Sequence, residues 1–352
     1  MRCVIVSYES CIMRVSTDAV SGFSESACRA ASGALSGFIM RAAGKVMGII
    51  MKNILTFLEE NAIKYKDKTA FVDLNDSVTY AELLARAQSI GSALSKTGTK
   101  NKPVAVYFDK CVNTISAMLG VVYSGNFYVV IDSEMPPARI NKIFGALSPV
   151  AVITDKKHHE NALQLEFSGE IFDLEEALSC EINSEKLAQI RSRQIDTDPL
   201  YALFTSGSTG VPKGAVVSHK SVMAYSEWVS NTFDITSETV FANQTPFYFS
   251  MSVTDVYSTL RNGATLAIVP KMYFSFPIKL VEFLDEYKAN TIYWVPSAIS
   301  MVSNFKVFDF QKPKYLNKVL FAGEVMPTKQ LNYWINNCLL YTSDAADEAR
   351  SV

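Results

Sequence analysis

Short apolar runs alternate along the chain with stretches in which apolar residues recur every three or four positions. The runs predict buried strands at 104–108, 127–131, 150–154, 265–269, 291–295 and 319–321. The longer spacing predicts helices at 51–65, 112–123, 138–147, 277–288 and 297–304. Strands that alternate with helices predict an α/β fold of doubly wound, mostly parallel sheets with helices on both faces.

One further helix has a clear start signal. Thr79 is followed three residues later by Glu82, which is the spacing of a capping box. Leu83 and Leu94 then fall on one side of the helix that follows. We therefore predict that a helix begins after Thr79 and turns this side toward the core.

The stretch 203–214, LFTSGSTGVPKG, combines the end of an apolar run with a loop of Thr, Ser and Gly. Little side-chain bulk lets backbone N–H groups approach a polyphosphate, and hydroxyl groups add donors. Lys213 adds a mobile positive charge. A flexible Gly/Ser turn is the alternative, but the apolar run before the loop and the Pro-Lys-Gly after it favour a phosphate-binding loop.

Two better-known loops do not fit this stretch. In a P-loop counted from Gly207, Pro212 stands where the second glycine belongs, and Gly214 stands where Ser or Thr belongs. A nucleophile elbow centred on Ser208 needs a glycine where the chain has Ser206.

Composition sets bounds on the class of protein. The chain has 352 residues, of which 49% are hydrophobic and 19% charged, as in ordinary globular proteins with a large core. A net charge of −2 gives no reason to expect nucleic acid as a partner, and no apolar run is long enough to predict membrane insertion. The six cysteines have no metal-binding spacing, so we predict no metal site in the protein and reduced thiols in the cytoplasm.

Both ends differ from the middle of the chain. Residues 1–50 are rich in Ser, Ala, Gly and Cys and lack amphipathic spacing, so we interpret them as a non-native or disordered leader, with a transit peptide as the alternative. Residues 338–352 break the helical pattern before them, and we interpret them as an artefactual tail. One domain is predicted at 51–337, with subdomains at about 51–198 and 199–337.

Several motifs between about Met51 and Asn337 resemble those of the adenylate-forming, or AMP-binding, superfamily. These motifs are the Thr79–Leu83 element TYAEL, SGNFYVVID at 124–132, the loop at 203–214, Ser218-His219-Lys220, the Phe247–Val253 stretch and LFAGE at 320–324. The superfamily includes acyl-CoA ligases, luciferases and amino-acid adenylation domains. FYFSMSVTDVYSTL together with FAGEVMP is most similar to D-alanine–carrier protein ligases and related adenylation domains.

The resemblance implies the large N-terminal domain of such an enzyme, with its C-terminal lid domain missing. It implies that ATP with Mg²⁺ activates a small carboxylic or amino acid, and that the acyl group passes to a carrier-protein phosphopantetheine or to coenzyme A. Thr205 and Lys213 are the implied catalytic residues. The implied phosphate-binding residues are Thr205, Ser206, Gly207, Ser208, Thr209, Gly210 and Lys213.

The resemblance also implies where the two ends of the adenylate bind. On the adenine side it implies Ala322, Gly323 and Glu324, and around the acyl group it implies Phe249, Ser250, Met251, Thr254, Ser297 and Leu320. Ser250 stands where amino-acid activators usually have an Asp for the substrate ammonium. Either the substrate lacks an α-amino group, another group supplies the charge, or Ser250 is a defect. Asp255 matches a family position nearby.

Other elements of the family are missing after Asn337, so we expect the 352-residue chain to bind nucleotide weakly at most and not to turn over. An acyl- or aryl-CoA ligase and a non-catalytic nucleotide-binding protein stay open as alternatives. His219 is interpreted as shaping the loop rather than as a catalytic base. His158 and His159 are predicted to lie on a solvated face.

Overall fold

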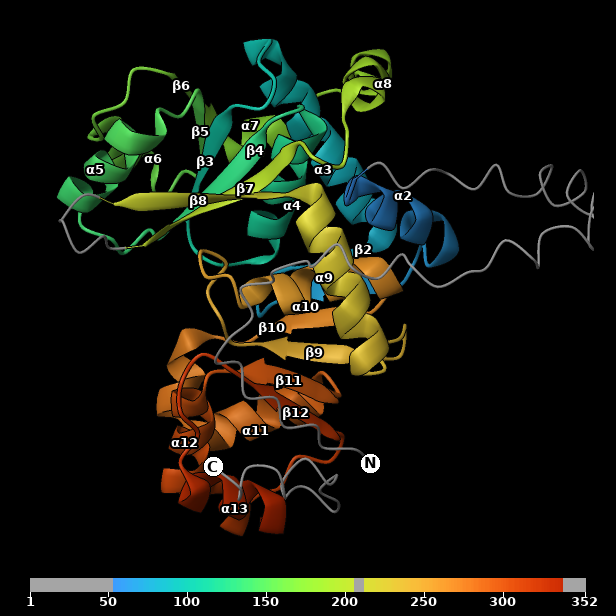
Figure 1. The fold of residues 1–352 in the computed structure, drawn as a ribbon, viewed down its shortest axis with the longest axis vertical. Helices are drawn as coiled ribbons and strands as arrows, with labels where there is room; N and C mark the ends of the chain where they lie inside the picture. Colours follow the sequence, from blue (N-terminus) through green and yellow to red (C-terminus); the bar gives the residue numbers. More distant parts are fainter. Residues whose placement is uncertain (1–52, 206–211, 338–352) are drawn as a thin grey trace, which may run out of the picture.

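The structure, a computed structural model, describes residues 53–205 and 212–337, which form two six-stranded sheets with helices between and around them (Figure 1). The upper sheet of Figure 1 has the order β6-β5-β3-β4-β7-β8. Its strands are β3 (Pro103–Tyr107), β4 (Phe127–Ile131), β5 (Ala151–Thr154), β6 (Glu170–Asp173), β7 (Pro199–Thr205) and β8 (Lys213–Ser218).

The lower sheet has the order β12-β11-β9-β10-β1-β2. Its strands are β1 (Thr69–Val72), β2 (Ser77–Thr79), β9 (Val240–Asn243), β10 (Thr265–Ile268), β11 (Thr291–Trp294) and β12 (Lys318–Phe321). Every pair of neighbours in the two sheets is parallel except β1–β2 and β7–β8. The predicted doubly wound, mostly parallel α/β fold is confirmed.

Helices between the sheets form the centre of the molecule. The helices of this layer and its margin are α2 (Leu55–Lys64), α3 (Tyr80–Leu94), α4 (Val112–Tyr123), α7 (Leu174–Leu178), α8 (Ser184–Arg193), α9 (His219–Thr232) and α10 (Ser252–Asn262). The hydroxyl of Tyr257 in α10 lies 2.6 Å from the hydroxyl of Tyr128 in β4. The Tyr80 hydroxyl in α3 lies 2.8 Å from the Thr259 carbonyl oxygen. These two contacts fix helix α10 to strand β4 of the upper sheet and to the start of helix α3.

The outer faces of both sheets are covered as well. Over the upper sheet lie α5 (Pro137–Leu147) and α6 (His159–Leu163). Over the lower sheet lie α11 (Pro277–Glu286), α12 (Pro296–Asn304) and α13 (Thr328–Asn337). Three short 3₁₀ helices complete the described elements: η1 (Ser95–Thr97), η2 (Lys271–Ser275) and η3 (Val307–Asp309).

Most predicted elements are present within a residue or two. The capping box is confirmed: the Thr79 hydroxyl accepts from the Glu82 backbone N–H at 3.2 Å, and the Glu82 carboxylate accepts from the Thr79 N–H at 2.8 Å. The elements that were not predicted are strands β1, β2, β6, β8 and β9 and helices α6, α7, α8, α9 and α10. Each sheet takes strands from both sides of residue 198, and the division into subdomains at 51–198 and 199–337 stays a prediction.

Some sequence predictions fall outside the described residues. These are the leader at 1–50, the tail at 338–352 and the loop residues 206–211. Among the helices of 53–205 and 212–337, none has the length and apolar character needed to cross a membrane.

Candidate functional site

The predicted phosphate loop joins β7 to β8 at the carboxyl end of β7. Thr205 and Lys213 are register partners at the open end of this antiparallel pair, and the Lys213 side chain is exposed. Gly214 lies opposite Phe204, and a Cβ at position 214 would come within 2.8 Å of the Phe204 ring. A larger residue at position 214 would therefore require the Phe204 ring to shift. Of the other implied phosphate-binding residues, Ser206, Gly207, Ser208, Thr209 and Gly210 lie outside the described residues.

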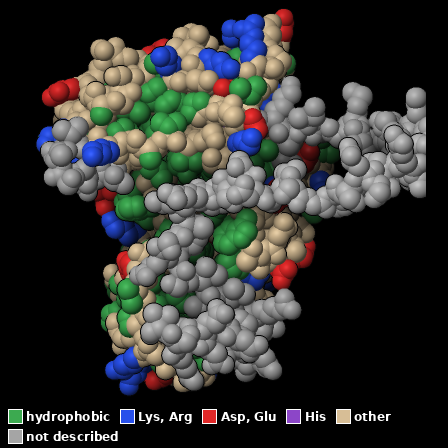
Figure 2. Space-filling view, in the orientation of Figure 1, with side chains coloured by type: hydrophobic (Ala, Val, Ile, Leu, Met, Phe, Trp, Pro, Cys, Tyr) green, Lys and Arg blue, Asp and Glu red, His purple; other side chains and the backbone are tan. Residues whose placement is uncertain are grey.

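The surface beside this hairpin is apolar. Val216 in β8 is 60% exposed, and most of the strand faces solvent. Figure 2 shows hydrophobic side chains gathered on the surface of the upper sheet over β7 and β8.

A cavity of about 370 Å³ adjoins β7 and β8 and reaches the carboxyl ends of the lower strands. Its lining comes from both sheets, from α9 and from the loop before α10: Tyr201, Val217, Ser221, Val222, Tyr225, Ser250, Met251, Val253, Tyr293, Ala322 and Gly323. We call it the neutral cavity, because none of these side chains carries a charge at neutral pH. It brings Ser250 and Met251 from the implied acyl pocket together with Ala322 and Gly323 from the implied adenine side.

Gly323 forms an open wall of the neutral cavity. Its φ of +93° lies in a region that L side chains rarely adopt. A Cβ there would lie 3.5 Å from the Met251 Sδ and would project toward the cavity lining. Glycine thus keeps the backbone after β12 accessible from the cavity.

Two implied pocket residues line a smaller adjoining cavity of about 20 Å³. These are Thr254 and Leu320, both buried, and this cavity shares Tyr225, Tyr293 and Ala322 with the neutral cavity. The Tyr225 hydroxyl lies 2.7 Å from the Thr254 Oγ1, so the two cavities are separated by a hydrogen-bonded wall.

The other implied site residues lie outside both cavities. Phe249 is 55% exposed and packs against Tyr248, with ring centroids 4.9 Å apart. The Glu324 carboxylate accepts from the backbone N–H of Ser297 at 2.9 Å and from its hydroxyl at 3.2 Å. This contact joins the end of β12 to the start of α12, and both residues are exposed.

Asp255 lies behind the neutral cavity and does not line it. Its side chain is fully buried, and its Oδ2 accepts from the Asn243 amide at 2.7 Å. Burial raises the pKa of Asp255 to about 7. The Lys110 ammonium, at the end of β3, donates to the backbone carbonyls of Asn243 and Gln244 at 3.2 and 3.1 Å, and burial lowers its pKa to about 7. This network fixes the backbone that leads from β9 into the Phe247–Met251 loop.

A second, larger cavity of about 630 Å³ lies where β3, β4, β9 and β10 end. We call it the charged cavity, since its lining includes Asp73, Asp109, Lys110, Asp132, Glu134, Lys157, His158 and Lys271. The prediction that His158 lies on a solvated face is wrong. The ring is buried, with Nδ1 2.6 Å from the Asp155 carboxylate and Nε2 3.3 Å from the Asp109 carboxylate.

His219 is the first residue of α9 and is also buried. Burial lowers its pKa to about 4, so the ring is neutral and weakly basic at neutral pH. It follows the end of β8 that is opposite the loop at 206–211, and the prediction that it shapes that loop stays a prediction.

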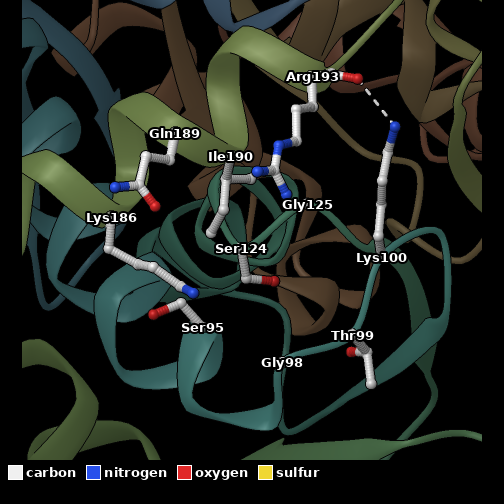
Figure 3. A pocket seen from close by; sticks show the side chains of 10 residues that line it. All are labelled: Ser95, Gly98, Thr99, Lys100, Ser124, Gly125, Lys186, Gln189, Ile190 and Arg193. Atoms are coloured by element: carbon white, nitrogen blue, oxygen red, sulfur yellow. Dashed lines mark hydrogen bonds between the residues drawn. The ribbon is translucent and has the colours of Figure 1, made fainter.

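A third cavity, of about 120 Å³, lies at the far end of the upper sheet between α8, η1 and the turn before β4 (Figure 3). It has a basic lining that includes Lys100, Lys186 and Arg193. The Lys100 ammonium donates to the Arg193 carbonyl at 2.8 Å and lies 3.4 Å from Asp198. None of the implied site residues lines it.

The tyrosines of the neutral cavity were not predicted from the sequence. Tyr201, Tyr225 and Tyr293 lie on three different elements, and each follows the apolar pattern of its own element. Only their meeting in the fold distinguishes them from core residues.

The strand order defines the chain as an α/β protein of the doubly wound class, in which ligands bind at the carboxyl ends of the strands, where the neutral cavity lies. The AMP-binding enzyme family matches residues 58–339, and the chain belongs to this family.

Known proteins similar to the chain include carrier-protein ligases. The chain is 29% identical over 307 residues to the L-proline–[L-prolyl-carrier protein] ligase of Pseudomonas fluorescens (strain Pf-5), covering 80% of this chain and 58% of that protein. It is 29% identical over 287 residues to the D-alanine–D-alanyl carrier protein ligase of Staphylococcus aureus (strain Newman), covering 81% and 57%. The chain thus spans less than three fifths of the length of these relatives.

Solved structures share the fold. They include the nonribosomal peptide synthetase FmoA3, with a TM-score of 0.72 and 21% identity over 81% of this chain and 30% of that one. VinN has a TM-score of 0.71 and 17% identity, over 82% and 72%. The fatty acyl-adenylate ligase of L. pneumophila, solved with acyl adenylate and pyrophosphate, has a TM-score of 0.69 and 20% identity, over 81% and 52%.

Proposed function

We propose that this chain supplies the ATP- and acid-binding part of a ligase that activates a small carboxylic or amino acid for a carrier protein, as in D-alanine–carrier protein ligases. A carboxylate oxygen bonds to the α-phosphorus of ATP, and pyrophosphate leaves. The phosphopantetheine thiol then bonds to the acyl carbon, and AMP leaves with the electron pair. Membership of the AMP-binding family and the activities named for its carrier-protein relatives support this proposal.

The neutral cavity is the observation that carries the proposal. Ser250 and Met251 form one part of its lining, and Ala322 and Gly323 form another. An acid held by the first pair and an adenosine held by the second would have their reacting groups side by side. Holding two reactants in this way removes much of the entropic cost of their encounter.

The hairpin tip would hold the triphosphate. Lys213 is exposed at the end of β8, opposite Thr205, and its charge would offset the repulsion between the phosphates and the incoming carboxylate. We therefore assign Thr205, Lys213 and loop residues 206–210 to phosphate binding.

Magnesium would enter with ATP. Among the residues that the structure describes, no group of three or more His, Cys, Asp and Glu side chains could hold a metal ion. This fits Mg²⁺, which keeps water ligands and is commonly held by substrate phosphates with one or two carboxylates. The ion would neutralise charge on the triphosphate.

A cytoplasmic location completes the proposal. It is supported by the requirement for ATP and by Cys111 and Cys180, which are free thiols in the described part of the chain.

Two alternatives make different predictions. An acyl- or aryl-CoA ligase would use the same first step with coenzyme A as the thiol, and the uncharged lining around Ser250 favours it over an amino-acid ligase. A non-catalytic nucleotide-binding protein would bind ATP without activating an acid.

ATP affinity of the 352-residue chain tests the proposal directly. We expect Lys213→Met to weaken ATP binding at least tenfold and to leave adenosine binding unchanged, because the lysine contacts only the phosphates. Lys220→Met is the matched control, since Lys220 is an exposed lysine at the start of α9. Calorimetric titration of both variants with ATP and adenosine gives the comparison.

No saturable ATP binding by the unmodified chain, or equal losses in the two lysine variants, would contradict the proposed site. Because the chain spans less than three fifths of its relatives, we also propose that it does not complete turnover alone. Acid-dependent ATP–pyrophosphate exchange by the isolated chain would disprove that second part only.

A further inference from the structure

The described residues that line the neutral cavity include no charged group with which to bind a second charge on the acid. Its polar groups are the hydroxyls of Ser221, Ser250 and three tyrosines, and the rest of its described lining is apolar or glycine. The smaller adjoining cavity also has no acidic or basic side chain.

Two candidate carboxylates lie close to the cavity in sequence but outside its described lining. Asp255 is fully buried behind the cavity, its Oδ2 accepts from Asn243, and its raised pKa of about 7 reflects the cost of ionising there. The Glu324 carboxylate accepts two hydrogen bonds from Ser297, outside the cavity lining. Neither carboxylate belongs to the described lining beside Ser250.

Building on the proposed function, we propose that the acid activated here has no charge other than the carboxylate that is adenylated. The substrate class is a hydroxy, aryl or short alkyl acid rather than an α-amino acid. An ammonium that enters this cavity would give up part of its water without gaining an anion from the described lining, which disfavours it. A hydroxyl or an apolar group carries no such penalty, and the serine and tyrosine hydroxyls can donate to or accept from a substrate hydroxyl.

Adenylate analogues test this in binding alone, without turnover. The probes are 5′-O-sulfamoyladenosine and its N-acyl derivatives in two isosteric pairs, alanyl with lactyl and phenylalanyl with phenyllactyl. Within each pair only an ammonium and a hydroxyl differ. Titration of the 352-residue chain at pH 6.5 keeps the amine charged, since α-amino groups titrate near pH 8.

In the pair that binds more tightly, we expect the hydroxy compound to bind at least tenfold better than the amino compound. A smaller ratio, or a preference for the amino compound, overturns the inference and leaves the nucleotide site intact. Failure of unacylated sulfamoyladenosine to bind would instead disprove the proposed function, and the inference with it.

Two variants test the role of Ser250, whose exposed position tolerates substitution. Ser250→Asp is expected to lower the hydroxy-to-amino ratio at least tenfold, because it adds the missing negative charge. The side chain introduced by Ser250→Asn has nearly the same shape as that introduced by Ser250→Asp but carries no charge. We expect it to leave the hydroxy-to-amino ratio within threefold of that of the unmodified chain. Equal ratios in the two variants would overturn the assignment of Ser250 to the acyl-binding wall. Thermal unfolding of both variants checks that they are folded.

Discussion

The neutral and charged cavities lie at the carboxyl ends of neighbouring strands, yet their linings differ in charge. The charged cavity takes its acids and bases from the residues that follow β3 and β4, such as Asp109 and Asp132, where the chain turns into solvent. The neutral cavity takes its lining from side chains of α9, β7 and β11 that also pack in the core. A cavity at the carboxyl ends of the strands can therefore be charged or uncharged. Its polarity depends on whether the lining side chains also pack in the core or lie in segments that turn into solvent.

The Asp255–Asn243–Lys110 network lies between the two cavities. Lys110 lines the charged cavity, while the charge of Asp255 contributes to raising the pKa of Tyr225 and Tyr293, which line the neutral one, after the larger effect of burial. The network holds the loop that separates the two linings.

Removing the buried carboxylate should have the largest effect. We expect Asp255→Ala to lower the free energy of unfolding by about 3 kcal/mol, because it leaves the buried Asn243 amide without its acceptor and opens a cavity in a fully buried site. Urea denaturation measures this change.

Glu134→Ala is the control from the charged cavity. Its side chain is 69% exposed and pairs with Lys271, and surface pairs of this kind contribute about 0–1 kcal/mol. Similar losses in the two variants would contradict the contrast between a buried and a solvent-exposed carboxylate.

The titration of Asp255 should also make the stability of the protein depend on pH. The pKa of Asp255 is raised in the folded state to about 7, so its contribution to stability is present below the unfolded pKa of about 4 and is lost as pH rises through 7. Relative to Asp255→Asn, the unmodified chain should lose roughly 3 kcal/mol between pH 4 and 7. Urea denaturation across this range measures the difference, and a flat difference would disprove the buried titration.

Lys110 should change the stability of the protein in the opposite direction and in a higher pH range. Its folded pKa is lowered to about 7, so its contribution is present above the unfolded pKa of about 10.4 and is lost as pH falls toward 7. Lys110→Met should remove the rise in stability between pH 7 and 10, which the same denaturation series would show. Persistence of that rise in the variant would assign it to other groups.

A methyl group on the wall of the neutral cavity should have a moderate effect. Gly323→Ala is expected to cost about 1 kcal/mol of stability, from its φ of +93°, and to weaken sulfamoyladenosine binding about tenfold. Gly98→Ala is the matched control: Gly98 has a φ of +64° and no atom within 4 Å of the added Cβ. Weaker binding in both variants would point to a general loss of structure.

The smallest effect is expected in the charged cavity. Lys157 pairs with Asp109 at 2.5 Å, but both side chains are largely exposed. Lys157→Ala should change stability by less than about 0.5 kcal/mol, and by less still at high salt, because solvent and ions screen the pair. A loss above about 1 kcal/mol in low-salt denaturation would contradict this prediction and would mean that solvent does not screen the Lys157–Asp109 pair.

The sequence predicted the parts of the molecule in which local signals agree with the fold. Helix α4 was predicted at its observed bounds, and α3 begins where Thr79 and Glu82 indicated. Strand β8 was missed because KGAVVS follows a glycine-rich loop and lies exposed at a sheet edge, without a buried apolar run. Local pattern therefore found buried strands better than edge strands.

The candidate site was predicted only in part, for a different reason. Ser250, Met251, Ala322 and Gly323 lie in motifs that the family resemblance marks, and the fold brings them together. No local pattern marks Tyr293 as cavity-lining, because its surroundings come from other elements that are distant in sequence. The buried environment of His158 depends in the same way on Asp109, which lies on another element.

The pairing of β1 with β10 also has a consequence for how the protein is made. Phe71 in β1 is the register partner of Leu266, so the nascent hairpin β1–β2 leaves the ribosome long before its neighbour in the lower sheet is translated. At about 5–20 residues per second this delay lasts roughly ten to forty seconds. During that time the β3–β4–β5 unit can assemble, while Phe71 and Val78 remain without their final packing. A chaperone that shields early apolar hairpins is expected to increase the yield of folded chain during synthesis.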